Sequence, residues 1–234
     1  QVVTYTDIPK DCPGKWRDTK WYPLQAATFK QKGVWIIYRD PTTIDKFPKK
    51  GQRKDQIVWM LMQDWDYPNW TDERIEQFDS ILTMSKWHAR HTVSKFPKAR
   101  KNMWLNSNGL KVDLIEEIEK EKIKRNPKKI IYTSSPDRGL KPALISFKKA
   151  REFVPDLQLH IFYGFNNIDK LIEKDPKSYY KGLKKELLQM MKQPGVHFHG
   201  RTTQPDLYRQ WLSSGIWIYQ TDFAASYRFN NTVF

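Results

Sequence analysis

The sequence predicts an α/β protein with parallel β-sheets, and three observations lead to this fold class. Short apolar runs rich in β-branched and aromatic residues recur along the chain. Amphipathic helical patterns separate several of these runs, as in βαβ units. The alternation is interrupted once, by a charged helical pattern that ends before Asn126 and Pro127. We therefore expect an N-terminal domain over residues 1–109, a charged helix and linker over 110–127, and a partial C-terminal domain over 128–234.

The first domain is predicted to begin with irregular structure. Prolines and a glycine interrupt residues 1–32, which indicates a loop or lid with one helix near residues 24–30. Helices are expected at 71–78, where Thr71 can cap the N-terminus, and at 87–96. The apolar runs of this half predict strands at 34–38, 57–62, 80–84 and 102–105.

The second domain continues the same alternation. In the charged helix before it, over residues 111–125, apolar side chains recur at helical spacing at Leu114, Ile115 and Ile118. No helix follows the last predicted strand, so we expect this domain to be less well closed than a complete one. The predicted strands are 130–133, 157–163, 196–199 and 216–219, and the predicted helices are 142–153, 179–192 and 204–213.

The charge balance favours anionic partners. The 234 residues include 41 Lys and Arg against 26 Asp and Glu, a formal net charge of +15. Nucleic acid, phosphorylated small molecules and acidic membranes are all attracted by such a surface. The basic residues are spread among acidic and apolar positions, and no nucleic-acid-binding motif accompanies them, which makes nucleic acid a weaker alternative.

The cysteine content and the apolar runs bear on the compartment. Cys12 is the only cysteine, so the chain has neither a disulfide framework nor a thiolate zinc site. No run of eighteen apolar residues and no signal-peptide pattern occurs, and we expect a cytoplasmic protein. The first residue is Gln1 rather than Met, which suggests that the sequence begins partway through a longer gene product or has been processed.

A turn at residues 133–139 is the first candidate site. It joins a buried strand to a helix and carries Ser134, Ser135, Asp137, Arg138 and Gly139. The free N–H groups of a helix N-terminus attract anions, a guanidinium forks onto a phosphate, and a glycine lets the backbone approach closely. An ordinary βα turn capped by Ser and Asp has the same composition, so both interpretations stay open.

Polar residues and glycines follow almost every other predicted strand. Ligands of open α/β sheets bind beyond the carboxyl ends of the strands, which favours a cleft lined by these residues. Any strand must also leave the core through polar turn residues, which explains any single case. The strand ends are Arg39-Asp40, Gln63-Asp64-Trp65, Ser85 to His88, Asn106 to Gly109, Ser134-Ser135, Gly164-Phe165, Gly200-Arg201 and Gln220-Thr221-Asp222.

The histidines do not predict a metal site. His88 and His91 stand at i and i+3 on a predicted helix, and His197 and His199 alternate on a predicted strand, but neither pair has a third ligand at suitable spacing. A surface or phosphate-contacting role is expected for His88 and His91. The sequence also lacks the dinucleotide fingerprint, the P-loop, the nucleophile elbow and the zinc-protease motif.

Four segments together resemble a known family. They are Ile131-Tyr-Thr-Ser-Ser-Pro-Asp-Arg-Gly-Leu140, Gln63-Asp64-Trp65, Phe78 to His88 and Asn106 to Gly109. They are similar to retaining glycosyltransferases of the GT-B fold, family 4-like, also called glycosyl transferases group 1, over roughly residues 30–223. The resemblance implies two Rossmann-like parallel-sheet domains that face each other across a cleft, with the C-terminal one binding a nucleotide-sugar.

The resemblance also implies roles for individual residues. Arg138 would pair with the diphosphate of a UDP- or GDP-sugar, in a loop shaped by Ser134, Ser135 and Gly139, and no metal or other cofactor would be required. Asp64 would be the catalytic candidate, and the acceptor would be a glycan, a lipid or a protein. The nucleoside side would comprise Gly164, Phe165, Gly200, Arg201 and Thr202, and the sugar and acceptor side Gln63, Trp65, Asn108, Thr221 and Asp222.

Two departures from the family qualify this expectation. The family opens on a strand and a Gly-rich loop, whereas this chain starts after them. Relatives continue past Thr221-Asp222-Phe223 into a glutamate motif that holds the donor sugar and ribose, and neither glutamate occurs here. We therefore expect a glycosyltransferase truncated at both ends or an inactive relative. The alternative is a non-catalytic basic α/β protein that binds anions or nucleic acid.

Overall fold

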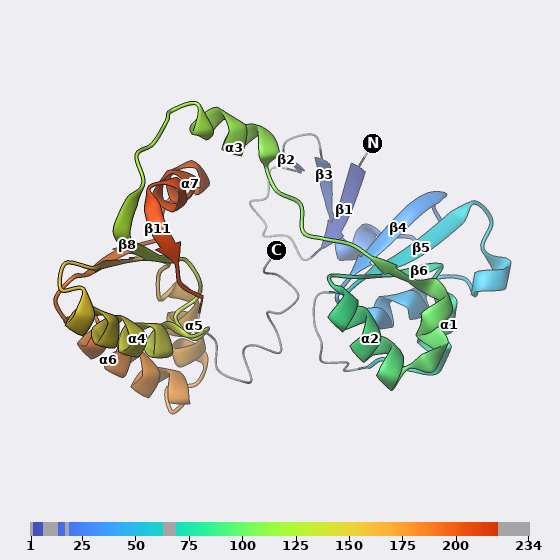
Figure 1. Ribbon diagram of the computed structural model, residues 1–234. Coiled ribbons are helices and arrows are strands. Elements are labelled where there is room, and N and C mark those ends of the chain that lie inside the picture. The colour runs from blue at the N-terminus through green and yellow to red at the C-terminus, as the bar shows by residue number, and fades with distance from the viewer. Residues whose placement is uncertain (1, 7–13, 17–18, 63–68, 220–234) are drawn as a thin grey trace. The chain divides into compact units, whose positions relative to one another are not determined.

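The computed structural model describes residues 2–6, 14–16, 19–62 and 69–219 (Figure 1). The described chain folds as two compact units, residues 2–108 and residues 109–219. Both are α/β units built around a four-stranded parallel sheet, and parallel sheets were predicted.

The first unit contains a four-stranded sheet whose strands are all parallel and follow chain order, β4-β5-β6-β7. Its helical connections include α1 (Asp72–Gln77) and α2 (Lys86–Lys95), with 3-10 turns η2 (Pro41–Lys46), η3 (Lys50–Gln52) and η4 (Pro97–Asn102). The Thr71 hydroxyl accepts a hydrogen bond from the Arg74 N–H at 3.3 Å, which confirms the predicted cap. The strands are β4 (Gly33–Tyr38), β5 (Gln56–Leu61), β6 (Ser80–Thr83) and β7 (Met103–Leu105).

The two faces of this sheet differ in burial. Side chains that alternate toward α1 and α2, such as Val58, Met60 and Ile81, are buried and pack on Ile75 and Phe78. On the opposite face, Val34 and Ile36 of β4 are 53% and 56% exposed, and Trp104 of β7 is 63% exposed. Parallel sheets are normally covered on both faces. The core of the first unit therefore lies on one side of its sheet.

The prediction of a loop or lid over residues 1–32 is wrong for the described part of this segment. β1 (Val2–Thr6) pairs in parallel with β3 (Thr19–Pro23), and β2 (Lys15–Trp16) pairs antiparallel with β3. The helix expected near residues 24–30 is only a 3-10 turn, η1 (Leu24–Ala26). The β-branched and aromatic residues of β1 and β3 explain the difference, because Tyr5 stacks on Tyr22 and on Trp35 with ring centroids 5.8 Å and 5.6 Å apart.

The second unit contains a parallel sheet of order β10-β9-β8-β11. Its strands are β8 (Asn126–Tyr132), β9 (Gln158–Phe162), β10 (Val196–Gly200) and β11 (Ser214–Trp217). Its helices are α3 (Val112–Glu119), α4 (Leu140–Phe153), α5 (Asn166–Lys174), α6 (Tyr179–Met190) and α7 (Gln204–Leu212). The helix α5 had not been predicted. The helix predicted over residues 111–125 is shorter, and the backbone turns left-handed at Lys122, with φ of 51°.

Helices cover both faces of this second sheet. Ile130 and Tyr132 of β8 point into a core that also contains Leu144 and Phe147 of α4 and Leu187 of α6. The alternate residues Lys129 and Ile131 point to the other face, where the Lys129 ammonium donates to Gln210 and Ser213 at 2.5 Å and 2.7 Å. Figure 1 shows α4 and α6 on one side of this sheet and α7 on the other. α4, which follows β8, and α7, which precedes β11, therefore lie on opposite faces of the sheet.

Candidate functional site

The strand order of the second unit has a topological switch point at the carboxyl end of β8. The chain leaves β8 through α4 to reach β9 on one side, whereas β11, on the other side of β8, is reached through α7 on the opposite face. Such a topological switch point is where open α/β sheets bind ligands, because the two diverging connections leave room above the strand ends. The turn singled out from the sequence, residues 133–139, lies at this point.

Hydrogen bonds within the turn fix its shape. The buried Tyr132 hydroxyl donates to the Ser135 carbonyl at 2.8 Å, and the Arg138 N–H donates to the same carbonyl at 2.8 Å. The Ser135 hydroxyl donates to the Asp137 carboxylate. Ser135 is buried, whereas Arg138 is exposed. The side chains of Ser135 and Asp137 are thus engaged with each other, and Arg138 is exposed at the surface of the turn.

Gly139 completes the turn and begins α4. Its φ is +102°, a conformation that L side chains rarely adopt, so glycine is required there. No side chain caps the N-terminus of α4, although the alternative interpretation of this turn requires a Ser or Asp cap. At the start of this fourteen-residue helix, the Leu140 N–H donates to the Pro136 carbonyl at 3.4 Å, the Ala143 N–H donates to the Gly139 carbonyl at 3.1 Å, and Pro142 has no N–H. The helix therefore offers the positive end of its dipole beside Arg138 rather than a row of free donors.

Tyr219, just after β11, interacts with Ser134 of the turn. Burial raises the pKa of its phenol, while a hydrogen bond with Ser134 and the positive charge of Arg138 act in the opposite direction. Burial also raises the pKa of the Tyr132 phenol well above its ordinary value. Both phenols therefore stay neutral at physiological pH. Sequence reasoning missed Tyr219 and Tyr132 as site residues, because only the pairing of β11 with β8 brings Tyr219 beside Ser134.

The ends of β9 and β10 lie along the same edge of the sheet. Gly164 is buried, and a Cβ atom there would lie 2.8 Å from the Asn166 side-chain oxygen and 3.6 Å from Cγ of Arg201. The Arg201 stem thus covers Gly164, and its guanidinium lies 5.5 Å from the Tyr163 ring centroid. Gly200 has a φ of +69°. The structure therefore brings the predicted residues Gly164, Gly200, Arg201 and Thr202 to one edge together with the turn.

Phe165 differs from its neighbours in burial. Its ring packs in the core of the second unit, 5.8 Å from the Phe198 ring, and the Lys184 ammonium lies 5.5 Å from its centroid. Only its backbone can face the edge of the sheet.

The predicted residues of the sugar and acceptor side are not assembled by the structure. Asn108 belongs to the first unit and is exposed beyond β7. Gln63, Asp64 and Trp65, together with Thr221 and Asp222, lie outside the described residues.

The surface role expected for the first histidine pair is wrong for His88. His88 is fully buried, and its Nδ1 accepts a hydrogen bond from the Met84 N–H at 3.5 Å. It lies on the buried side of α2, where its ring can bond to a backbone group. His91 is half-buried and stacks on Trp87 with centroids 5.0 Å apart, and burial lowers its pKa.

The second histidine pair gains a third member from β9. His160, His197 and His199, here called the histidine ladder, stack across β9 and β10, with the His160 ring 4.7 Å from His197 and 5.2 Å from His199. His160 Nδ1 and His199 Nε2 share a hydrogen bond of 3.0 Å. Within the described ranges, no group of three or more His, Cys, Asp or Glu is placed to hold a metal ion. None of the described helices has the length and apolar character to cross a bilayer.

Comparisons with known proteins show which solved structures share this fold. The sequence matches no family profile and no curated protein. The structure is similar to a glycosyltransferase from Rickettsia africae, with a TM-score of 0.54, 14% identity and coverage of 80% of this chain and 51% of the other. It is also similar to HepE from Anabaena, solved with UDP, with a TM-score of 0.53 and 11% identity. That match covers 80% of this chain and 53% of HepE. A third similar structure is the catalytic domain of starch synthase IV from Arabidopsis thaliana, bound to ADP and acarbose. Its TM-score is 0.51 at 11% identity, and the match covers 82% of this chain and 53% of the other.

These identities are low, and the likeness concerns the fold alone. The chain spans about half the length of the solved structures that it matches. The chain has an incomplete GT-B-like α/β fold with parallel sheets.

Proposed function

We propose that this chain is part of a glycosyltransferase that takes a sugar from a nucleoside diphosphate sugar and transfers it to an acceptor with retention. The observation that carries the proposal is the position of the turn at residues 133–139, at the switch point of the second sheet, with the exposed Arg138 beside the N-terminus of α4. The ligands of the fold neighbours support it, since HepE was solved with UDP and starch synthase IV with ADP.

The chemistry of a diphosphate leaving group accounts for this arrangement. Negative charge grows on the diphosphate as its bond to the sugar breaks. Arg138 supplies a fixed positive charge with two parallel donors, and the N-terminus of α4 adds the positive end of the helix dipole. These groups stabilise the departing diphosphate without a metal ion. Gly139 has no Cβ atom, which would let the phosphates approach its backbone closely.

The remaining edge of the sheet would hold the nucleoside. The backbone of Gly164, Phe165 and Gly200 offers donors and acceptors for a base, and Arg201 and Thr202 are exposed beside them. Because the Phe165 ring is in the core, its contribution would come from the main chain. A UDP- or GDP-sugar remains the expected donor, and the acceptor class stays a glycan, a lipid or a protein.

The remaining predicted residues would form the sugar and acceptor side. Asp64 is the proposed catalytic residue, with Gln63, Trp65 and Asn108 near the sugar, and Thr221 and Asp222 on the same side. If Asp64 acts only in transfer, Asp64→Asn should abolish sugar transfer from a radiolabelled nucleotide-sugar and leave UDP affinity unchanged. Equal loss of both would assign Asp64 to binding or to folding instead.

Calorimetry with UDP and GDP on Arg138 variants tests the proposal. Arg138→Ala should weaken binding by about 1.5–3 kcal/mol, the range for hydrogen bonds to charged groups. Arg138→Lys should recover part of this, because the charge remains and the fork is lost. The matched control is Arg125→Ala, an exposed arginine just before the amino end of β8, at the opposite edge of the sheet. It should leave the affinity unchanged, and all three variants should melt near the parent temperature.

Two results would overturn the glycosyltransferase assignment. One is an unchanged diphosphate affinity in Arg138→Ala. The other is a chain that binds neither UDP, GDP nor their sugars at millimolar concentration but binds an oligonucleotide with a steep dependence on salt. The net charge of +15 favours that second candidate function, a basic anion-binding protein.

A further inference from the structure

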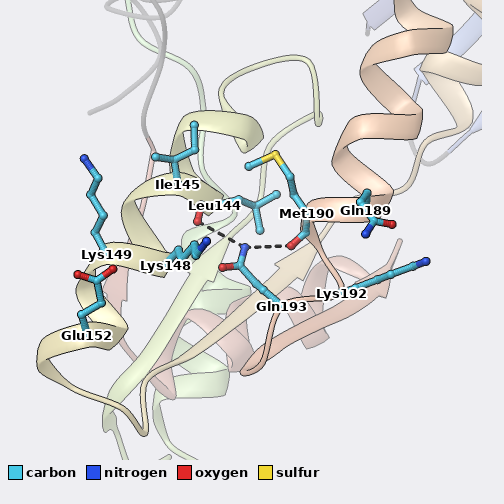
Figure 2. Close-up of a pocket in the computed structure, with 9 residues that line it drawn as sticks. All are labelled: Leu144, Ile145, Lys148, Lys149, Glu152, Gln189, Met190, Lys192 and Gln193. Carbon is cyan, nitrogen blue, oxygen red and sulfur yellow. Dashed lines mark hydrogen bonds between the residues drawn. The ribbon is translucent and has the colours of Figure 1, made fainter.

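A basic groove lies between α4 and α6, on the side of the second sheet away from α7 (Figure 2). It encloses about 640 Å³, within the range of ligand-binding sites. Leu144, Ile145 and Met190 form its apolar part, and Lys148, Lys149 and Lys192 stand around it. We call this surface the α4–α6 groove.

The polar backbone near the floor of this groove is already satisfied. The Gln193 side-chain amide donates to the Met190 carbonyl at 3.0 Å and reaches the Leu144 carbonyl at 3.4 Å, as Figure 2 shows. The polar groups that remain to bind a ligand are therefore those at the rim of the groove. That rim carries three ammonium groups and one carboxylate, Glu152, so an anion complements it.

Solvent-exposed apolar side chains lie beside these lysines. Phe153 is 84% exposed at the end of α4, and it lies at i+4 from Lys149 on the same helix face. Ile145 and Leu188 are also exposed, on α4 and α6. The lysine stems can extend along such apolar surface while their ammonium groups stay in a polar layer. Exposed aromatic and aliphatic side chains among lysines are typical of surfaces that lie in the interface of a membrane.

We propose that the α4–α6 groove and Phe153 form a docking surface for membranes that contain anionic phospholipid. The lysines would meet headgroup phosphates, and Phe153 would enter the boundary between headgroups and acyl chains. A folded protein partner fits less well, because protein interfaces are depleted in lysine and enriched in arginine. The arginine of this helix, Arg151, is already held by the Pro155 carbonyl, to which its Nε donates at 2.9 Å.

Co-sedimentation of the full chain with vesicles tests this proposal. Binding is expected to vesicles of 70% phosphatidylcholine and 30% phosphatidylglycerol and to be much weaker to pure phosphatidylcholine, and high salt should reverse it. Each lysine near an anionic surface strengthens binding roughly fivefold. The triple variant Lys148→Glu, Lys149→Glu, Lys192→Glu should therefore lose at least about a hundredfold. Phe153→Ser should lose several-fold, and its salt dependence should be unchanged.

A second triple charge-reversal variant separates the effect of where the lysines lie from the effect of the total charge. Lys120, Lys122 and Lys124 are exposed just after α3, and their reversal to Glu changes the total charge by the same amount. This control should bind vesicles nearly as well as the parent, and melting curves should show both triple variants folded. Equal losses in the two triple variants, equal binding to both lipid mixtures, or no binding at low salt would overturn the proposal. Binding of a polyglutamate peptide at the groove, with vesicles left unbound, would assign the surface to acidic proteins instead.

Discussion

Replacing Gly215 with alanine is expected to destabilise the second unit and displace the end of β11. A Cβ atom on Gly215 would lie 2.5 Å from Cα, 2.6 Å from O and 2.8 Å from C of Pro127. Real Cβ contacts are essentially never shorter than 3.0 Å. All three atoms belong to the backbone, so no side-chain rotation relieves the clash. The pairing of β11 with β8 changes register at this glycine, and alanine would force the two strands apart.

The size of the effect follows from the number of atoms involved. Overpacking of a well-packed site costs about 1–3 kcal/mol. Because three backbone atoms are approached at once and two paired strands must separate, we expect the upper end, about 3 kcal/mol. For a unit of this size that corresponds to a melting temperature lower by on the order of 10 °C. UDP affinity should fall as well, since β11 carries Tyr219 to its contact with Ser134.

Thermal melts and calorimetry with UDP measure the two effects. Gly182→Ala is the matched control, because Gly182 lies inside the exposed part of α6 and a Cβ atom there would meet nothing within 4 Å. It removes a helix-interior glycine and should stabilise the chain by about 1 kcal/mol. If Gly215→Ala melts at the parent temperature, the close approach of β11 to β8 is not as the structure describes it, and the placement of Tyr219 loses its support.

Two further outcomes are expected. Tyr132→Phe removes the hydroxyl that donates to the Ser135 carbonyl, so stability should fall by about 1 kcal/mol and UDP binding should weaken; an unchanged UDP affinity would mean that this bond does not shape the turn. Burial, helped by the charges of Lys129 and the rest of the histidine ladder, lowers the pKa of His160 to about 4. The unfolded chain then binds a proton between pH 6.5 and 4 that the folded chain does not, so stability should be lost as pH falls through this window. After allowance for solvent screening, the loss in free energy of unfolding should be about 1 kcal/mol. Between pH 7.5 and pH 5.0 the melting temperature should fall less in His160→Gln than in the parent. Equal falls in the two proteins would contradict this prediction.

Several elements follow from local chemistry that is visible in the sequence. Buried parallel strands such as β8 and β9 read as continuous apolar runs, and α4 and α7 combine helical periodicity with a start signal, so their positions were predicted to within a few residues. The turn at residues 133–139 was visible because Gly139 and the polar residues before it are what a strand-to-helix turn needs. The β1 and β3 strands were missed because prolines nearby outweighed their β-branched and aromatic residues, whose value depends on pairing with each other.

Which strand ends meet depends on long-range packing. The order β10-β9-β8-β11 depends on which face each connecting helix takes, and local sequence does not contain that information. This order places Tyr219 beside Ser134, brings His160 against two histidines nearly forty residues away, and turns Lys129 toward α7. The same is true of burial: His88 and Phe165 look like surface or site residues in the sequence, but the packing of their helices against the sheets buries both. Long-range packing therefore set the geometry of the candidate site, while short-range chemistry set the elements that carry it.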